Sequence, residues 1–378
     1  MTKSERSPND EIRKGTKLFG FSSTAFELRV YFGFRPSDLP LLMATPRWQR
    51  LAQNFALSLG VFLLCAGVFE LFLRLNGYGN LEIYEPDPVL YWKLKPNQDC
   101  YTKVDHKPVH INSHGTRGPE FQTQKPTNSL RILSLGDSRT FGWGLSESET
   151  YSGVLQNLLQ KEAPAGKRIE VINAGVNAWS YPQMSVYFRD VALRYHPDIV
   201  ILAEANLWTQ FSEKNSPEFV KKFIGRVRLK NFLRHFAMYH YVVEVKLKNF
   251  YERHRTRFIP IDPKQDPLFK EQQQAEPDAL FHAAIESLCR LAQDRGVKPV
   301  LLYLPALDEA GATNSPAILN VKRDISRKLN LPLLDLTSEV QLHGNSLYLQ
   351  ADPVHFNAAG NATIARQLLD SVRPLTAQ

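Results

Sequence analysis

Cysteine is scarce in this chain, and its spacing excludes several kinds of site. The three cysteines are Cys65, Cys100 and Cys289. No CxxC pair occurs, so neither a zinc ribbon nor a thioredoxin-like redox motif is present. Cys100 and Cys289 could pair outside the cytoplasm, but a disulfide requires a specific Cα separation that the sequence does not give. The sequence therefore leaves a Cys100–Cys289 disulfide open.

Long hydrophobic runs and strong charge bias are also lacking. Only one apolar run is long enough to cross a bilayer, which excludes a polytopic transporter. Lys and Arg total 46 and Asp and Glu total 38, and half of the net charge of +8 comes from residues 1–50, with nine basic and five acidic residues. Such a small, spread surplus does not favour nucleic acid as a partner. At 378 residues, 43% hydrophobic and 22% charged, the chain has the composition of one large or two globular domains.

The single apolar run has the properties of a membrane anchor. Residues 51–69 carry no charge, and an extension to Leu75 adds only Glu70 and Arg74. A helix needs about 20 apolar residues to cross the hydrocarbon layer, and a cleaved signal would lie nearer the N-terminus. The remaining alternative is a buried core helix. We predict a transmembrane anchor at 51–75, a cytoplasmic segment at 1–50 because basic residues precede the span, and a C-terminal part outside the cytoplasm.

Beyond the anchor, the pattern changes twice along the chain. Short apolar pieces separated by Pro, Gly and Asn predict a β-rich lead-in at 77–129. Buried strands then alternate with amphipathic helices, which predicts a parallel sheet covered on both faces in a domain at 130–374. The expected strands are 131–136, 168–175, 197–205, 298–305 and 331–336, and the expected helices are 149–162, 182–195, 277–295, 315–330 and 357–372.

A basic segment at about 207–276 interrupts this alternation. Residues 214–257 contain twelve Lys/Arg against three Asp/Glu, interleaved with aromatic and aliphatic residues. Three interpretations stay open at this stage. The segment is a helical insertion with a solvated basic face, a cap over the active site, or a surface that touches anionic lipid or polysaccharide.

The first chemical signal is the stretch GDSRTFGWG at 136–144, directly after an expected buried strand. In an open α/β sheet, ligands bind outside the carboxyl ends of the strands, so Ser138 can project its hydroxyl into that crevice. A plain glycine-rich turn is the alternative. A P-loop is excluded because GxxxxGK[ST] is absent.

The second signal is the stretch DPVHFN at 352–357, just before the last expected helix. A serine nucleophile needs a base, and a histidine base works best when a carboxylate orients it. Asp352 and His355 are three residues apart and can both face the same sheet edge. A turn with a surface histidine is the alternative, and no further residues suggest a metal site, so we expect neither metal nor cofactor.

Together, GDS at the first strand and DxxH before the last helix resemble the SGNH (GDSL-type) hydrolase superfamily over about 131–372. The stretch HINSHGTRG at 110–118 resembles the lead-in of its membrane-anchored bacterial members. The resemblance implies a three-layer α/β/α, flavodoxin-like domain after one transmembrane helix, placed at the bacterial inner membrane. It also implies Ser138 as nucleophile, Asp352 as orienting acid and His355 as general base.

The resemblance further implies an oxyanion hole built from the N–H groups of Ser138 and Gly175 and the side chain of Asn206. Asn206 departs from the family pattern GxND, because the chain reads AEANLW at 203–208. Asn177 is the weaker substitute for it.

The function implied is a membrane-anchored serine esterase that forms an acyl-enzyme. Its partners are then an ester of envelope polysaccharide, such as an acetyl ester, or of lipid, and the membrane through 51–75, with no nucleic acid. Two alternatives remain: an O-acyltransferase that uses the same triad, and a non-catalytic domain that binds glycan or acts as a scaffold. The acyl group, the alcohol, the oligomeric state and the role of the basic insertion are not determined by the sequence.

Overall fold

The computed structural model describes residues 46–81, 84–102, 106–204, 217–247, 250, 279–310, 317–350 and 352–376. The chain divides into two units, residues 1–62 and residues 63–378. Most of the predicted cytoplasmic segment at 1–50 and much of the predicted insertion at 207–276 lie outside the described residues.

A five-stranded parallel sheet forms the centre of the second unit. Its strand order is β6-β5-β7-β8-β9, with every neighbouring pair parallel. The strands are β5 (Ser129–Gly136), β6 (Arg168–Gly175), β7 (Ile199–Leu202), β8 (Lys298–Tyr303) and β9 (Leu333–Asp335). This 2-1-3-4-5 order is that of flavodoxin-like folds, which bind ligands where the order reverses, here at the carboxyl ends of β5 and β7.

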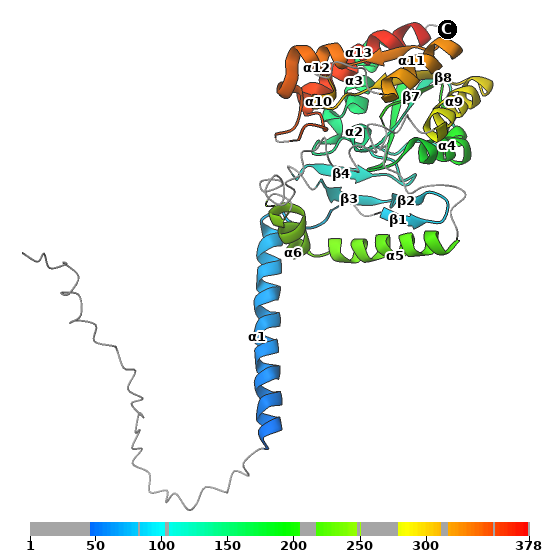
Figure 1. Cartoon of the computed structure of the whole chain (residues 1–378). Coiled ribbons are helices and arrows are strands. Elements are labelled where there is room, and N and C mark those ends of the chain that lie inside the picture. The colour runs from blue at the N-terminus through cyan, green and yellow to red at the C-terminus, as the bar shows by residue number, and fades with distance from the viewer. Residues whose placement is uncertain are drawn as a thin grey trace, which may run out of the picture. The chain divides into compact units, whose positions relative to one another are not determined.

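Helices cover both faces of the sheet, as Figure 1 shows. Alternate side chains of one strand enter different cores: Leu133 of β5 packs into one and Ile132 into the other, because successive residues of a strand point to opposite faces. The helices are α3 (Tyr151–Glu162), α4 (Tyr181–Asp190), α9 (Ala279–Asp294), α11 (Ala317–Leu329), α12 (Thr337–His343) and α13 (Ala358–Thr376). Helices α4, α9 and α11 contribute to the first core, and α3, α12 and α13 to the second. The predicted three-layer α/β/α fold is confirmed.

Two antiparallel hairpins precede the sheet, in the region predicted as a β-rich lead-in. Strand β1 (Tyr84–Asp87) pairs with β2 (Tyr91–Leu94), and β3 (Gln98–Tyr101) pairs with β4 (Pro108–Ile111). A bridge between Arg117 and Asn173 joins the end of this lead-in to β6.

Helix α1 (Arg47–Leu75) contains the predicted anchor. It is the one helix in the described part of the chain that is long and apolar enough to cross a membrane. Leu73 is its only buried residue. The alternative of a core helix is therefore not supported, because a core helix would bury its apolar side chains within the protein.

Helix α5 (Pro217–Arg234), the short α6 (Ala237–Tyr239) and the π-helix η4 (His240–Leu247) form the described part of the basic insertion. The last turns of α1 contact the start of α6. The Glu70 carboxylate accepts hydrogen bonds from the backbone N–H groups of Ala237 and Met238 at 2.8 and 2.9 Å. Helix α5 packs against β1 and β2 (Figure 1).

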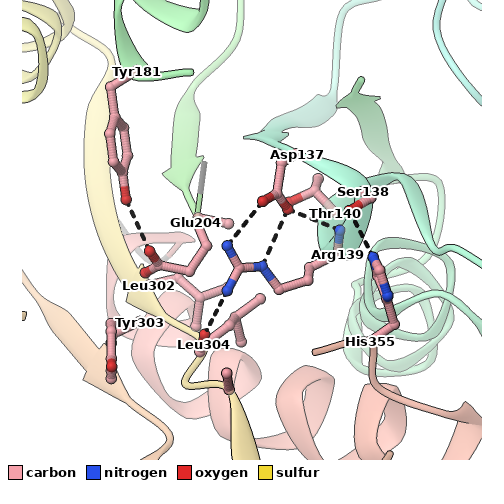
Figure 2. A network of polar contacts seen from close by, with 12 residues as sticks. Asp137, Ser138, Arg139, Thr140, Tyr181, Glu204, Leu302, Tyr303, Leu304 and His355 are labelled. Carbon is pink, nitrogen blue, oxygen red and sulfur yellow. Dashed lines mark hydrogen bonds and ion pairs between the residues drawn. The ribbon is translucent and has the colours of Figure 1, made fainter. Parts of the chain in front are cut away.

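A buried ion pair lies at the carboxyl ends of the central strands. The ammonium of Lys322, on α11, donates to the carboxylate of Glu204 and to the backbone oxygen of Leu302, and the two charged side chains are 0% and 3% exposed. The Tyr181 hydroxyl also donates to Glu204, at 3.0 Å (Figure 2). Burial lowers the pKa of Lys322, and the adjacent Glu204 carboxylate counteracts that effect. The pair links β7, β8 and α11 directly below the edge of the sheet where ligands are expected.

We predict that Lys322→Met lowers the free energy of unfolding by about 3–5 kcal/mol, because it leaves the Glu204 carboxylate buried without its cation. The double variant Lys322→Met/Glu204→Gln is expected to regain part of this loss. Arg327→Met is the control, because Arg327 pairs with Asp324 on the surface of the same helix and such pairs contribute about 0–1 kcal/mol. Denaturant unfolding of the full chain in detergent measures all three, and equal effects of Lys322→Met and Arg327→Met would contradict the prediction.

Candidate functional site

Ser138 lies at the turn between β5 and the short helix α2 (Ser138–Phe141), at the carboxyl edge of the sheet. Asp137 caps this helix, since its Oδ1 accepts a hydrogen bond from the Arg139 N–H at 2.9 Å. Gly136 is required at the end of β5, because a Cβ there would lie 1.9 Å from Oγ1 of Thr140. Because Gly136 has no side chain, α2 can begin directly after β5, and Ser138 lies at the edge of the sheet.

The Arg139 side chain fixes the loop around Ser138. The guanidinium of Arg139 is held by both oxygens of Asp137, at 3.2 and 2.8 Å, and by the backbone oxygen of Leu304 at 3.0 Å (Figure 2). The backbone N–H of Asp137 donates to the oxygen of Glu204 at 2.9 Å. Strands β5, β7 and β8 are therefore joined at the point where Ser138 begins α2.

His355 and Asp352 meet Ser138 from the loop before α13. Oγ of Ser138 lies 2.8 Å from Nε2 of His355, and Nδ1 of His355 lies 2.7 Å from Oδ2 of Asp352. Oδ1 of Asp352 accepts the N–H groups of Val354 and His355, at 3.0 and 3.1 Å. Ser138 and His355 are 217 positions apart in the sequence. Together with Asp352 they form one continuous hydrogen-bonded row.

The electrostatics of this row favour an ionised Asp352. Burial alone would raise the pKa of the Asp352 carboxyl, but the hydrogen bond and charge of His355 and the two backbone N–H groups outweigh it and lower that pKa. The carboxylate is therefore retained at pH values below the usual range for Asp. An ionised carboxylate at Nδ1 orients the imidazole so that Nε2 can take a proton from the Ser138 hydroxyl.

A cavity of about 800 Å³ opens above Ser138 and His355. Its walls come from the edge of the sheet, from the lead-in and from α5. The lining residues include Trp92 of β2, Asn177 after β6, Phe223 of α5 and Glu309 after β8. The Trp143 indole also lines the cavity and stacks on the His355 ring, with 5.6 Å between ring centroids. The row of Ser138, His355 and Asp352 is thus open to a ligand on the side that carries the reactive hydroxyl.

The structure does not bring Gly175 to this cavity. Its backbone N–H donates to Oδ1 of Asn173 at 3.0 Å, and a Cβ at Gly175 would lie 2.2 Å from the backbone nitrogen of Phe141. The glycine is required because α2 packs directly against the end of β6, and this packing explains its presence without a role in oxyanion binding.

Ala178 lines the cavity in its place, three residues after β6. It has a φ of 63°, in the left-handed region that non-glycine residues rarely adopt. No hydrogen-bond partner for its N–H lies among the described residues, and the same is true of the N–H of Ser138. The sequence signal for Ala178 was weak, because alanine carries no sign of a special backbone conformation.

The two asparagines considered for the third donor differ in what the structure shows. Asn206 lies outside the described residues, so its predicted role stays a prediction. Asn177 lines the cavity, and its Nδ2 donates to the Tyr84 hydroxyl at 2.6 Å. Its amide therefore braces β1 of the lead-in against the loop after β6.

Arg117 is a supporting residue that the sequence interpretation did not single out. It is 2% exposed, and its guanidinium donates to the backbone oxygens of Phe141 and Gly142, at 2.6 and 2.8 Å, and of Leu145. It thereby fastens the lead-in to the loop that follows Ser138. The signal was its position in HINSHGTRG, directly before the sheet.

Two expectations about other kinds of site can also be compared with the structure. Cys100 and Cys289 are both buried free thiols, so the open question of a disulfide between them is answered negatively in this structure. Burial raises the pKa of the Cys289 thiol to about 12, which makes it unreactive. Within the described ranges, no group of three or more His, Cys, Asp or Glu side chains is placed to hold a metal ion.

Comparison with known proteins gives distant structural likenesses only. No family model and no curated protein matches the sequence. Similar solved structures include TesA, at 15% identity over 65% of this chain and 99% of that chain with a TM-score of 0.41. The psychrotrophic esterase EstA from Pseudoalteromonas sp. is 16% identical over 66% and 99%, with a TM-score of 0.39. The two-domain esterase CEX, active on acetylated mannans, is 17% identical over 66% of this chain, which spans half of that esterase, with a TM-score of 0.41.

We predict that Ala178→Gly raises the free energy of unfolding by up to about 1 kcal/mol, because glycine adopts the left-handed conformation without the cost that a Cβ imposes. Ala283→Gly is the matched control, since Ala283 lies exposed within α9 and should lose about 0.5–1 kcal/mol in a regular helix. Opposite signs in denaturant unfolding are the expected result. Similar losses in both variants would show that the backbone at Ala178 is not constrained to φ near 63°.

Proposed function

We propose that the chain is a serine ester hydrolase of the SGNH type that works through an acyl-enzyme. The observation that carries the proposal is the row Ser138–His355–Asp352, with contacts of 2.8 and 2.7 Å at the carboxyl edge of the sheet, beneath an open cavity. A hydroxyl, an imidazole and a half-buried carboxylate in this order are what nucleophilic catalysis at an acyl carbon requires. The GDS and DxxH motifs that supply them support the SGNH assignment.

In the proposed reaction, Nε2 of His355 takes the proton of the Ser138 hydroxyl while Oγ attacks the ester carbonyl. The tetrahedral intermediate collapses when the carbonyl–alkoxy bond breaks, and the alcohol leaves with the proton from His355. Water then gives a proton to the same imidazole and attacks the acyl-enzyme. The bond between the acyl carbon and Oγ of Ser138 breaks, Oγ takes the proton back from His355, and the acid leaves. Asp352 holds the imidazole in the required tautomer and stabilises its protonated form.

The oxyanion donors in this proposal are backbone N–H groups of the cavity wall and one amide. The N–H of Ser138 at the start of α2 is the first donor, and the N–H of Ala178 takes the position that the sequence assigned to Gly175. Asn206 follows β7 and remains the proposed third donor. Loss of one such donor costs about 10²–10³-fold in rate in related sites.

We place the site outside the cytoplasm, on a protein anchored in the bacterial inner membrane through residues 51–75. The support is the exposed apolar surface of α1 and the basic residues that precede the span. An extracytoplasmic esterase held at that membrane is close to esters of envelope polysaccharide and of lipid.

An O-acyltransferase is the second candidate, because the cavity is roomy. A volume of about 800 Å³ leaves space beside a small acyl-enzyme for an acceptor alcohol in the position of water. A non-catalytic scaffold is less well supported, since it would not require Ser138, His355 and Asp352 to be hydrogen-bonded to one another.

We expect the full chain in detergent to hydrolyse p-nitrophenyl esters, and Ser138→Ala to lose about 10³-fold or more in kcat/KM because the nucleophile is removed. Chain lengths from acetyl to octanoyl distinguish acetyl esters from lipid esters. Ser148→Ala is the control, because Ser148 is exposed and follows the GDS motif in the sequence. Its kcat/KM should stay near that of the wild type. Labelling of Ser138 by a fluorophosphonate without turnover would point to the transferase. Absence of both labelling and turnover would contradict the proposal.

We expect Asp352→Asn to lower kcat by about 10³–10⁴-fold with little change in KM, because the amide neither stabilises a protonated imidazole nor selects its tautomer. The ionised Asp352 carboxylate also raises the free energy of unfolding. This contribution is complete above the pKa of Asp in the unfolded chain and is lost as the pH falls through the lower pKa of Asp352 in the folded protein. Asp324→Asn, an exposed aspartate of α11, is the control for removing one negative charge. Steady-state kinetics at pH 7–8 decide the matter, and a kcat near the wild-type value would remove Asp352 from the proposed row.

A further inference from the structure

One face of α5 forms a wall of the cavity above Ser138. The residues of α5 that line it recur every three or four positions, which places them on a single helix face. They are Phe223, Arg226, Val227, Lys230, Asn231 and Arg234. Every turn of this face therefore presents a cation to the cavity.

This face is held firmly against the lead-in. The side-chain amide of Asn231 pairs with the backbone of Tyr84 in both directions, accepting from its N–H at 3.2 Å and donating to its oxygen. The guanidinium of Arg234 lies over the Tyr84 ring, 5.1 Å from its centroid, and the Phe223 ring stacks on Trp92 at 5.4 Å. These contacts fix both ends of the cationic face relative to β1 and β2.

The charges that line the cavity are unequal in sign. Among the described residues that line the cavity, four are Arg or Lys and two are Asp or Glu. Asp137 is already paired with Arg139 at 2.8 Å, and the Glu309 carboxyl accepts from the N–H of Ala306 at 2.8 Å. Burial also raises the pKa of Glu309. Three of the four basic lining residues, Arg226, Lys230 and Arg234, belong to α5.

Arg226 and Lys230 line the cavity and stay exposed to solvent, whereas Arg234 is only 2% exposed. The opposite side of α5 carries further exposed basic residues, among them Lys221 and Arg228, neither of which lines the cavity. Solubility does not explain the position of Arg234, because a cation needed only for hydration would lie on that exposed side, where no desolvation cost arises. Guanidinium groups bind carboxylate and phosphate oxygens in paired hydrogen bonds, and attraction strengthens where water is partly excluded.

We propose that the substrate of this site carries a negatively charged group, a carboxylate or a phosphate, beside its ester, and that Arg226 and Lys230 bind it, supported by Arg234. The proposal rests on the proposed function, since it concerns the same cavity. The uncharged part of the substrate would then lie against Trp92, Trp143 and Val354, which also line the cavity.

The test measures binding apart from catalysis. In the full chain carrying Ser138→Ala, calorimetry compares 4-acetamidobenzoate with its uncharged methyl ester, two amides that differ by the carboxylate charge and one methyl group. The anion is expected to bind about 5–30-fold more tightly, the range of one charge-assisted contact. Adding Arg226→Gln and Lys230→Gln should abolish this preference, whereas adding Arg228→Gln should keep it. Equal binding of the two ligands, or a preference that survives loss of Arg226 and Lys230, overturns the proposal.

Kinetics with the active chain separate this proposal from the proposed function. The ratio of kcat/KM for 4-acetoxybenzoate over its methyl ester is compared between wild type and the Arg226→Gln/Lys230→Gln variant, so that the intrinsic reactivity of the two esters cancels. We expect the ratio to fall about 5–30-fold, mainly through KM, and to fall also when NaCl rises from 0.05 to 0.5 M. An unchanged ratio with normal turnover contradicts the anion site alone. No turnover of either ester contradicts the esterase, while the binding measurement still decides the anion site.

Two macromolecular sources can supply such an anionic ester. Faster release of acetate from an acetylated polyuronate than from acetylated xylan, dependent on Arg226 and Lys230, would identify a glycan. Faster release of fatty acid from vesicles of an anionic phospholipid than from neutral phospholipid, with the same dependence, would identify a lipid. Release that shows no preference for the charged member of either pair counts against the proposal.

Discussion

The buried ion pair between Lys322 and Glu204 is the interaction on which the site depends most. It lies where β7 and β8 end, and the backbone oxygen of Glu204 holds the N–H of Asp137 at the end of β5. A buried pair of this kind is costly to break because either charge alone would remain desolvated. The three strand ends, and with them the turn that presents Ser138, are therefore held by this pair together with the contacts of Arg139 and Asp137 at the same edge of the sheet.

Around this centre, parts of the chain that are distant in sequence each supply one element of the site. The lead-in holds the loop after Ser138 through Arg117, and the loop before α13 supplies His355. Helix α5 closes the cavity from the side and introduces positive charge, while α1 contacts the N-terminal end of α6 through Glu70. In the described part of the basic segment, α5 lines the cavity, and a cap over the active site stays a prediction.

The backbone at the edge of the sheet shows how packing and chemistry share the same residues. Gly175 is needed because α2 approaches the end of β6 too closely for a side chain, and its N–H is bound by Asn173. Ala178 lines the cavity instead, and its backbone adopts a left-handed conformation. Strain of this kind persists only where the surrounding structure enforces it, as it does between β6 and α4.

The sequence by itself determined the order and type of the elements, because continuous apolar strands alternating with amphipathic helices are a local pattern that only a covered parallel sheet satisfies. It also singled out Ser138, Asp352 and His355 as candidates, since each lies in a short motif next to a strand end or helix start, and their catalytic roles stay predictions. It could not determine Ala178, Arg117 or the α5 wall. A backbone conformation, a guanidinium bound to carbonyls 24 to 28 residues away and a cavity between a helix and a hairpin arise only when distant segments pack together.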